Sequence, residues 1–163
     1  MTPEPLLELA AGDADDAAAV MAVMGRAFDP RWGEAWTRPQ LGAVLAGPGA
    51  WLRVMRDAGD GRGGVGAPCG FAVARVAADE AELLLIAVAR PGLGHGTRLL
   101  RAMLDDARAR GASRFFLEMR DGNPAERMYR REGFVPVGRR RGYYRGPGGE
   151  QYDALTFARS LAQ

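Results

Sequence analysis

The stretch ELLLIAVARPGLGHGTRLL, residues 82–100, decides the fold of this chain. It begins with six consecutive apolar residues, Leu83 to Val88, a run typical of a strand covered on both faces. Pro91 ends the strand, and three alternating glycines then precede a helical pattern: Gly92, Gly94 and Gly96. The first N–H groups of a helix have no internal partners and carry the positive end of its dipole. The stretch therefore predicts a strand, a glycine turn and a helix start that can hold a phosphate group.

The residues of this turn leave three interpretations open. The turn is a plain strand-to-helix connection, a dinucleotide site, or the pyrophosphate loop of the GNAT acetyltransferases, which has the form (Gln/Arg)xxGxG/A and which this stretch resembles. A dinucleotide site requires GxGxxG after the first strand, with an acidic residue about 20 residues later. Here the spacing is GxGxG and the turn lies in the second half of the chain, so the dinucleotide site is the least favoured.

Length and composition predict one domain over residues 1–163, because the chain is long enough for a single good core. Apolar residues make up 47% of the chain and charged residues 26%, as in ordinary globular proteins. All 22 basic residues are arginine, which indicates a genome-wide bias and weakens any functional interpretation of arginine clusters. With a net charge of only +2, we expect no nucleic-acid or membrane partner.

The rare reactive residues narrow the chemistry further. Cys69 and His95 are the only cysteine and histidine, which excludes an internal disulfide and makes a transition-metal site improbable. Cys69 is a nucleophile or an inert core residue, and the second is favoured because no base partner is evident. No apolar run approaches the ~20 residues of a membrane span, and the N-terminus lacks a signal-peptide pattern, so we expect a cytoplasmic protein.

Hydrophobic periodicity and turn residues predict seven strands and four helices. The strands are expected at residues 6–9, 51–56, 69–77, 82–88, 114–120, 134–137 and 152–159. The helices are expected at residues 13–28, 37–45, 97–110 and 123–132, with exposed loops at 57–68 and 139–149. Several strands follow one another without helices between them, so a mixed sheet flanked by four helices fits better than a doubly wound fold.

Glu118 is the candidate general base. It lies in the apolar strand FFLEM, directly after the helix that follows the glycine turn. Burial in apolar surroundings raises the pKa of a carboxylic acid towards neutrality, which suits a base that removes a proton from an ammonium group. The alternative is a solvated or ion-paired residue on the outer face of a half-buried strand.

Tyr129 is the candidate proton donor, because a phenol can protonate a departing thiolate within hydrogen-bond reach. Its alternative is a core aromatic at helical spacing from Ala125. Backbone amides near Ile86 to Val88 are candidates for polarising a thioester carbonyl, if the strand bulges there.

Residues from about Glu80 to Leu161 resemble a bacterial GNAT of the ribosomal-protein-alanine N-acetyltransferase type. The matching pieces, in the family's order, are DEAELLLIAV, GxG before TRLL, FFLEMR, RRRGYY, GEQYDALTF and the spaced set Asn123, Tyr129, Gly133 and Phe134. The chain departs from the family in three places. It is about two residues shorter between Val88 and Gly94. It has Pro91 where Gln or Arg is usual and Leu93 where a second basic residue often lies, and the interval from Asn123 to Tyr129 is one residue short.

The resemblance implies the GNAT fold and acetyl transfer from acetyl-CoA to an amine without a covalent enzyme intermediate. It implies that Glu118 accepts a proton and that Tyr129 donates one. It also implies that acetyl-CoA, without a metal, contacts Ile86, Ala87, Val88, Gly92, Leu93, Gly94, His95, Gly96, Thr97 and Asn123.

The resemblance further implies that the acceptor is a protein N-terminus, an alanine of a small-subunit ribosomal protein. The alternatives are a small-molecule amine such as an antibiotic or polyamine, and a non-catalytic acyl-CoA-binding domain. The family's peptide-side wall is resembled by Tyr143, Tyr144 and Arg139–Arg141, and the alternative is that these residues form a solvated loop. Two further aromatic residues, Trp32 and Trp36, either line the acceptor cleft or belong to the core. We expect a monomer or weak dimer.

Overall fold

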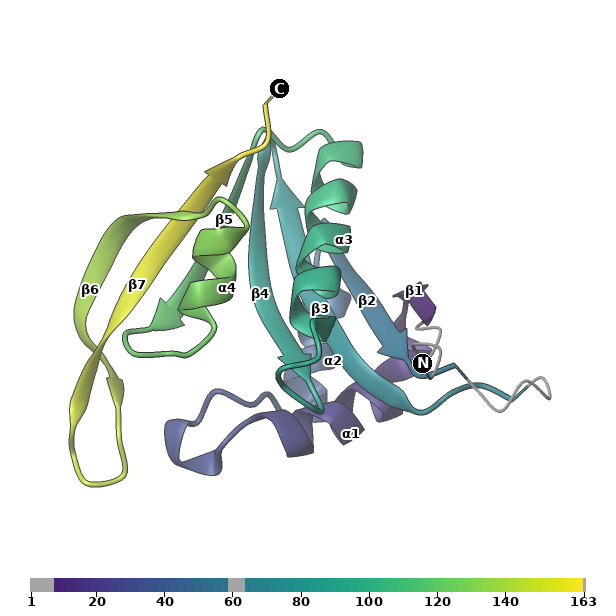
Figure 1. Cartoon of the computed structure of the whole chain (residues 1–163), viewed down its shortest axis with the longest axis horizontal. Helices are drawn as coiled ribbons and strands as arrows, with labels where there is room; N and C mark the ends of the chain where they lie inside the picture. The colour runs from purple at the N-terminus through teal and green to yellow at the C-terminus, as the bar shows by residue number, and fades with distance from the viewer. Residues whose placement is uncertain (1–7, 59–63, 163) are drawn as a thin grey trace.

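The computed structural model describes residues 8–58 and 64–162, and its strands form one seven-stranded sheet in the order β1-β2-β3-β4-β5-β7-β6 (Figure 1). Only β4 and β5 run parallel, and every other neighbouring pair is antiparallel. The strands are β1 (Glu8–Gly12), β2 (Ala50–Arg56), β3 (Pro68–Ala77), β4 (Glu80–Val88), β5 (Arg114–Arg120), β6 (Val135–Arg145) and β7 (Gln151–Ser160). The mixed sheet with four helices is therefore confirmed, and the single domain over residues 1–163 stays a prediction.

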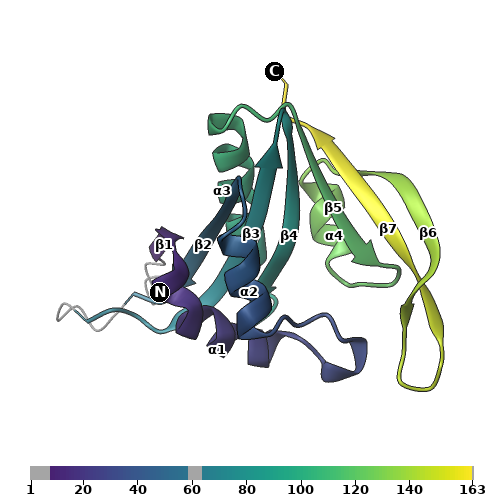
Figure 2. The ribbon, with the colours of Figure 1, turned by 180° about the vertical axis from the view of Figure 1, so that it is seen from behind.

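The helices cover both faces of this sheet. Figure 1 shows α3 and α4 on the near face, and Figure 2 shows α1 and α2 on the other. Their bounds are α1 (Ala17–Ala27), α2 (Arg38–Leu45), α3 (His95–Ala109) and α4 (Glu126–Arg131). Short 3₁₀ turns, Ala14–Asp16 and Pro30–Trp32, precede α1 and α2. A capping box stabilises the start of α2, because Thr37 and Gln40 each bond the other's backbone N–H.

The core forms two apolar clusters, one beneath each pair of helices. The larger joins α3 to the sheet through side chains that include Leu99, Leu100 and Met103, all fully buried. The smaller lies under α1 and α2 around Phe71 and Val73. On β5 the expected alternation is confirmed, because Phe115, Leu117 and Met119 are buried while Phe116 and Glu118 are half-exposed.

The site is positioned by a split between the two parallel strands. β4 pairs with β5 only from Glu80 to Leu83, and the last pair joins Leu83 to Leu117. Beyond that pair the strands diverge towards their carboxyl ends, as Figure 1 shows. The remaining residues of β4, Leu84 to Val88, therefore have β3 on one side and no paired strand on the other.

Two expectations about β4 are wrong in detail. Leu84, Leu85 and Ile86 are half-buried rather than fully covered, because the split exposes this part of the strand. The β-bulge lies where Val73 pairs with Leu85 and Ala74 with Leu83, not at residues 86–88. The irregularity therefore lies at the beginning of the split.

The expectation of a loop over residues 139–149 is wrong for residues 139–145, whereas residues 146–149 do form a turn. β6 continues to Arg145 and pairs with β7 down to the Arg145–Gln151 pair, with two irregularities in register. β6 is exposed along almost its whole length, so its residues carry no apolar alternation by which a strand is recognised. Of the other expectations, Leu6 and Leu7 of the first strand and residues 59–63 of the expected 57–68 loop lie outside the described residues.

Candidate active site

A pocket of about 370 Å³ lies at the split between β4 and β5. It combines residues from both strands with side chains from α4, the α1–α2 connection and β6. Its lining includes Glu34, Trp36, Leu83, Leu84, Leu85, Ile86, Leu117, Glu118, Met119, Asn123, Tyr129, Tyr143 and Tyr144. The two predicted catalytic residues therefore share one cavity, although they come from different elements.

Glu118 enters the pocket from the face of β5 opposite the large core. Its side chain is 24% exposed, and its Oε2 lies 3.3 Å from Nε of Arg140 on β6. Strand alternation and the pairing of Glu118 with Thr156 and of Arg140 with Ala154 place both side chains on one face of the sheet. Glu118 is thus an ion-paired, partly solvated carboxylate, which agrees with the second of the two interpretations that the sequence left open.

Tyr129 reaches the same pocket from α4, on the other face of the sheet. Only 6% of the residue is exposed, and its ring packs edge-on against Phe134 at 5.9 Å between centroids. Burial, and secondarily the charge of Glu34, raise the pKa of Tyr129 well above its ordinary value of 10. The phenol therefore keeps its proton at neutral pH, as a proton donor must. Tyr129 is both a core aromatic and a pocket residue.

Asn123 lies at the turn before α4 and also lines the pocket. Its Oδ1 accepts a hydrogen bond from the N–H of Ala125 at 2.9 Å, so the carbonyl oxygen stabilises the turn. The helix itself begins at Glu126, later than the expected start at Asn123. Despite the short interval between them, Asn123 and Tyr129 thus contribute to one cavity.

The glycine turn forms the predicted helix start. Gly92 and Gly94 have φ values of +83° and +77°, and nothing lies within 4 Å of the position of an added Cβ at either residue. Gly94 is the N-cap of α3, and no side chain caps the helix there. Within residues 8–58 and 64–162, the N–H groups of His95, Gly96 and Thr97 make no hydrogen bond to protein. This open, uncapped helix start has the donors that a pyrophosphate requires.

Gly96 and His95 serve the fold as well as the turn. A Cβ on Gly96 would lie 3.1 Å from Sδ of Met128, so a side chain here would press on the packing of α3 against α4. His95 is 6% exposed, and its buried Nδ1 has no partner among the described residues. Leu93 is 53% exposed beside them, whereas Thr97 is half-buried.

The chain therefore fits acetyl-CoA at this end of the sheet. Three unpaired helix amides can donate hydrogen bonds to the diphosphate. The β4 edge from Leu84 to Val88 has no neighbouring strand on the β5 side, so its main chain can bond an extended ligand. Of the other expected contacts, Ile86 lines the pocket, Val88 is half-buried and Ala87 is 6% exposed.

The pocket also contains three of the aromatic residues singled out in the sequence, Trp36, Tyr143 and Tyr144. Tyr143 and Tyr144 stack edge-on at 5.2 Å, and Trp36 lines the cavity beside them. Burial, followed by the charges of Glu118 and Glu34, raises the pKa of Tyr144 to about 12. Trp32 instead packs edge-on against Tyr152 at 4.9 Å, so the two tryptophans have different roles.

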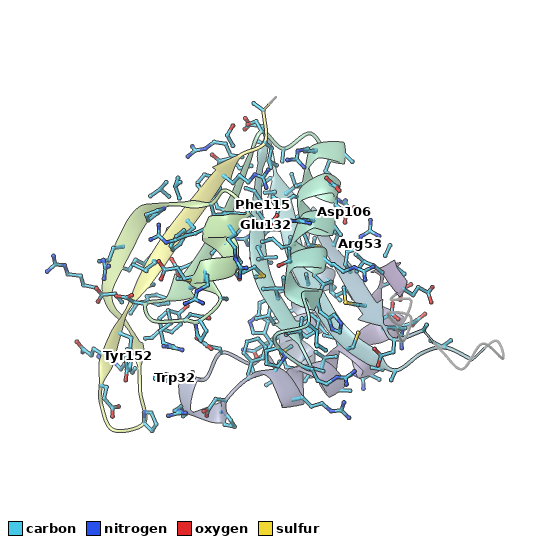
Figure 3. All side chains as sticks on the ribbon, in the orientation of Figure 1. Trp32, Arg53, Asp106, Phe115, Glu132 and Tyr152 are labelled. Atoms are coloured by element: carbon cyan, nitrogen blue, oxygen red, sulfur yellow. The ribbon has the colours of Figure 1, made fainter. Side chains whose placement is uncertain are left out.

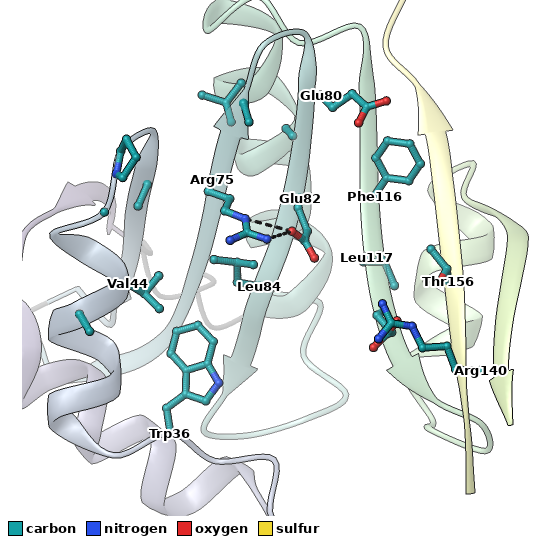
Figure 4. Close-up of a pocket in the computed structure, with 18 residues that line it drawn as sticks. Trp36, Val44, Arg75, Glu80, Glu82, Leu84, Phe116, Leu117, Arg140 and Thr156 are labelled. Atoms are coloured by element: carbon teal, nitrogen blue, oxygen red, sulfur yellow. Dashed lines mark hydrogen bonds and ion pairs between the residues drawn. The ribbon is translucent and has the colours of Figure 1, made fainter. Parts of the chain in front are cut away.

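A larger groove of about 850 Å³ continues from this pocket along β4 and β5 (Figure 4). The two share Trp36, Leu84, Leu117 and Glu118. In Figure 4, Arg140 extends from β6 across β7 towards β5 at one side of the groove. The pocket at the split is thus open along the face of the sheet that carries Glu118.

The sequence reasoning missed Glu34. It lies between Trp32 and Trp36 in a segment without regular structure, lines the pocket and has a side chain that is 18% exposed. The only signal was an acidic residue between two tryptophans in a stretch that breaks helical periodicity. No pattern of that kind indicates which site the residue will reach.

A mixed sheet that splits between two parallel strands, with a glycine turn and helix at the split, defines the class of acyl-CoA-dependent N-acyltransferases. The chain belongs to the acetyltransferase (GNAT) family, whose sequence model matches residues 18–134. It is 34% identical over 91 residues to the ribosomal protein bS18-alanine N-acetyltransferase of Haemophilus influenzae. That match covers 55% of this chain and 62% of the relative's length.

Solved structures show the same fold. The ribosomal-protein-S18-alanine N-acetyltransferase of Escherichia coli superposes with a TM-score of 0.82 and 25% identity, over 97% of this chain and 96% of the other. The yncA protein of Salmonella typhimurium, solved with its cofactor acetyl-CoA, superposes with a TM-score of 0.76 and 19% identity, over 97% of this chain and 95% of the other.

No group of three or more His, Cys, Asp or Glu side chains among the described residues is arranged to hold a metal ion. None of the helices in this part of the chain has the length and apolar character that crossing a membrane requires.

Proposed function

We propose that this chain transfers the acetyl group of acetyl-CoA to a primary amine, and that this amine is the N-terminal alanine of a ribosomal protein. The observation that carries the proposal is the convergence of Glu118 and Tyr129 in one pocket at the β4–β5 split. Relatives that cover about half of the chain act on the alanine of ribosomal protein bS18, which supports the choice of acceptor.

Bound acetyl-CoA supplies the activated acetyl thioester. The uncapped amides of His95, Gly96 and Thr97 bind its diphosphate, and the unpaired edge of β4 orients the rest of the ligand. Ile86 to Val88, Leu93 and Asn123 complete the proposed contact set, with the flanking glycines Gly92 and Gly94. N–H groups on the free edge of β4 stabilise negative charge on the carbonyl oxygen.

Glu118 and Tyr129 move the protons. The acceptor enters as an ammonium ion, and Glu118 removes a proton so that the amine nitrogen has a free electron pair. Tyr129, whose phenol is protonated at neutral pH, donates its proton to the thiolate as the C–S bond breaks, and the proton that the new amide nitrogen loses returns to the phenolate. The family resemblance implies direct transfer without a covalent enzyme intermediate. Cys69 is consistent with this, because it is buried and burial raises the pKa of its thiol, which makes it a poor nucleophile.

A small-molecule amine is the second candidate acceptor. A volume of about 370 Å³ lies within the range of pockets that bind small ligands. The open groove beyond Glu118 favours a polypeptide instead, because it leaves room for the residues behind the reactive amine.

An acetyl-transfer assay tests the proposal. The acceptors are a short peptide with the N-terminal sequence of bS18, the same peptide with a blocked N-terminus, spermidine and an aminoglycoside. We expect transfer to the free peptide alone. Transfer only to a small amine would show that the acceptor is a small molecule and not a protein N-terminus. Calorimetric binding of acetyl-CoA without any transfer would identify a non-catalytic acyl-CoA-binding domain. No binding at millimolar acetyl-CoA would exclude the enzyme altogether.

A further inference from the structure

Arg120 is a buried cation at the end of β5 whose charge the proposed chemistry does not use. Only 8% of the residue is exposed. Its guanidinium carbon lies 3.8 Å from the ring centroid of Trp32 and 5.7 Å from that of Tyr152. Figure 3 shows Trp32 and Tyr152 beside each other, from the α1–α2 connection and from β7. Arg120 thus joins two segments that are far apart in the sequence.

The charge of Arg120 has one carboxylate near it. Nε of Arg120 lies 3.4 Å from Oε1 of Glu34, and the two side chains are 10% and 18% exposed. Within the described residues no other acidic group comes within ion-pair distance of Arg120, and its Nε makes no geometrically good hydrogen bond. Because a buried guanidinium is stable only when it is paired, Glu34 and Arg120 hold each other in place.

Among the described residues, Arg120 is the only ion-pair partner of Glu34. Residues 33–37 belong to no helix or strand, so no backbone ladder fixes the direction of its side chain. Nevertheless it lines the cavity that contains Glu118, and its charge contributes to the raised pKa values of Tyr129 and Tyr144. Arg120 and Glu118 share a face of β5 by strand alternation, so the Arg120–Glu34 pair lies on the acceptor side of the sheet.

We propose that Arg120 is a positioning residue that holds Glu34 in the pocket, where Glu34 is a second carboxylate that binds the cationic amine of the acceptor beside Glu118. This inference rests on the proposed function. The two carboxylates have separate tasks: Glu118 takes up the proton, and Glu34, held by Arg120, binds the ammonium group. Glu34 therefore sets the affinity for the acceptor and not the affinity for acetyl-CoA.

The kinetic test compares Glu34→Gln, Arg120→Met and Arg120→Lys with the wild type. Arg53→Met is the matched control, because it removes an arginine paired with Asp106 at 2.6 Å, well away from Trp32 and Tyr152 (Figure 3). We expect Glu34→Gln and Arg120→Met to raise the acceptor KM about tenfold, the effect of losing one charge-assisted contact. The KM for acetyl-CoA should stay within about twofold, Arg120→Lys should restore part of the loss, and Arg53→Met should change neither constant.

A second measurement does not depend on the acceptor. Hydrogen exchange of residues 30–36 should be faster in Arg120→Met than in the wild type and in Arg53→Met. If the wild type acetylates no amine, the proposed function fails, and faster exchange still shows that Arg120 holds this segment. Unchanged exchange, an unchanged acceptor KM, or equal increases in both KM values would each overturn the inference.

Discussion

Arg140 lies beside the candidate base, with its Nε 3.3 Å from Oε2 of Glu118. The arginine side chain is 62% exposed and that of the glutamate 24%, so the pair lies at the mouth of the pocket and not in its interior. The guanidinium is also 5.2 Å from the ring centroid of Tyr143. An acceptor ammonium that approaches Glu118 must therefore compete with Arg140 for the same carboxylate.

Replacing the base should affect catalysis far more than binding. We expect Glu118→Gln to lower turnover at neutral pH by about 10²- to 10⁴-fold, the usual contribution of a general base, with little change in acetyl-CoA affinity. Steady-state kinetics and calorimetry measure the two effects. Glu82→Gln is the matched control, because Glu82 lines the groove but pairs with Arg75 at 2.7 Å. Unchanged turnover in Glu118→Gln would show that another group removes the proton.

Removing the cation of Arg140, which competes with the acceptor for Glu118, should raise kcat/KM for the acceptor amine. We expect Arg140→Gln to raise kcat/KM for the amine up to about fivefold, because an exposed ion pair is worth at most about 1 kcal/mol. Added salt should raise the wild-type value in the same direction and change the variant less, since salt screens exposed pairs. A lower kcat/KM in Arg140→Gln would mean instead that Arg140 binds part of the substrate.

Tyr129→Phe should slow the chemical step without weakening acetyl-CoA binding. The phenol supplies a proton to the thiolate, and general acids typically contribute about 10²- to 10⁴-fold. Single-turnover measurements separate this step from product release. Equal single-turnover rates in the variant and the wild type would leave Tyr129 with its packing role against Phe134 alone.

Alkaline pH should destabilise the fold through the half-buried phenol of Tyr144. The folded-state pKa of Tyr144 is raised from 10 to about 12, so its contribution to stability is fully present below pH 10 and is lost as the pH rises through 12. Urea unfolding should therefore show a free energy that falls above pH 10, and less steeply in Tyr144→Phe. Tyr143→Phe is the control, because Tyr143 is 54% exposed. An identical pH slope in Tyr144→Phe and the wild type would contradict this prediction.

The glycine turn should not tolerate a side chain where φ is positive. Gly94→Ala should lower the free energy of unfolding by about 1 kcal/mol and weaken acetyl-CoA binding, because the left-handed N-cap strains any residue with a Cβ. Gly25→Ala is the matched control in α1, at a position with open space and helical geometry, where alanine should stabilise the fold by up to about 1 kcal/mol. Equal acetyl-CoA affinity in Gly94→Ala and the wild type would show that the glycine turn does not bind acetyl-CoA.

Most of the regular elements could be predicted, because local patterns encode them. The apolar repeat of α3 and the alternation of β5 are properties of neighbouring residues, as is the capping box at Thr37. β6 could not be predicted past Val137, because an exposed strand paired only with β7 has no apolar face. The bulge opposite Val73 and Ala74 was misplaced for a similar reason, since strand register depends on the partner.

The sequence by itself determined the sheet-and-helix content, the glycine turn and the two residues on which the chemistry was expected to rest. Only the tertiary structure decided that Glu118 is ion-paired with Arg140. It also decided that Tyr129, from the opposite face of the sheet, and Glu34 line the same pocket as Glu118. The physical reason is that periodicity records which side of its own element a residue faces. The approach of β5, α4 and an irregular segment to one pocket depends on packing between parts of the chain that no local pattern connects.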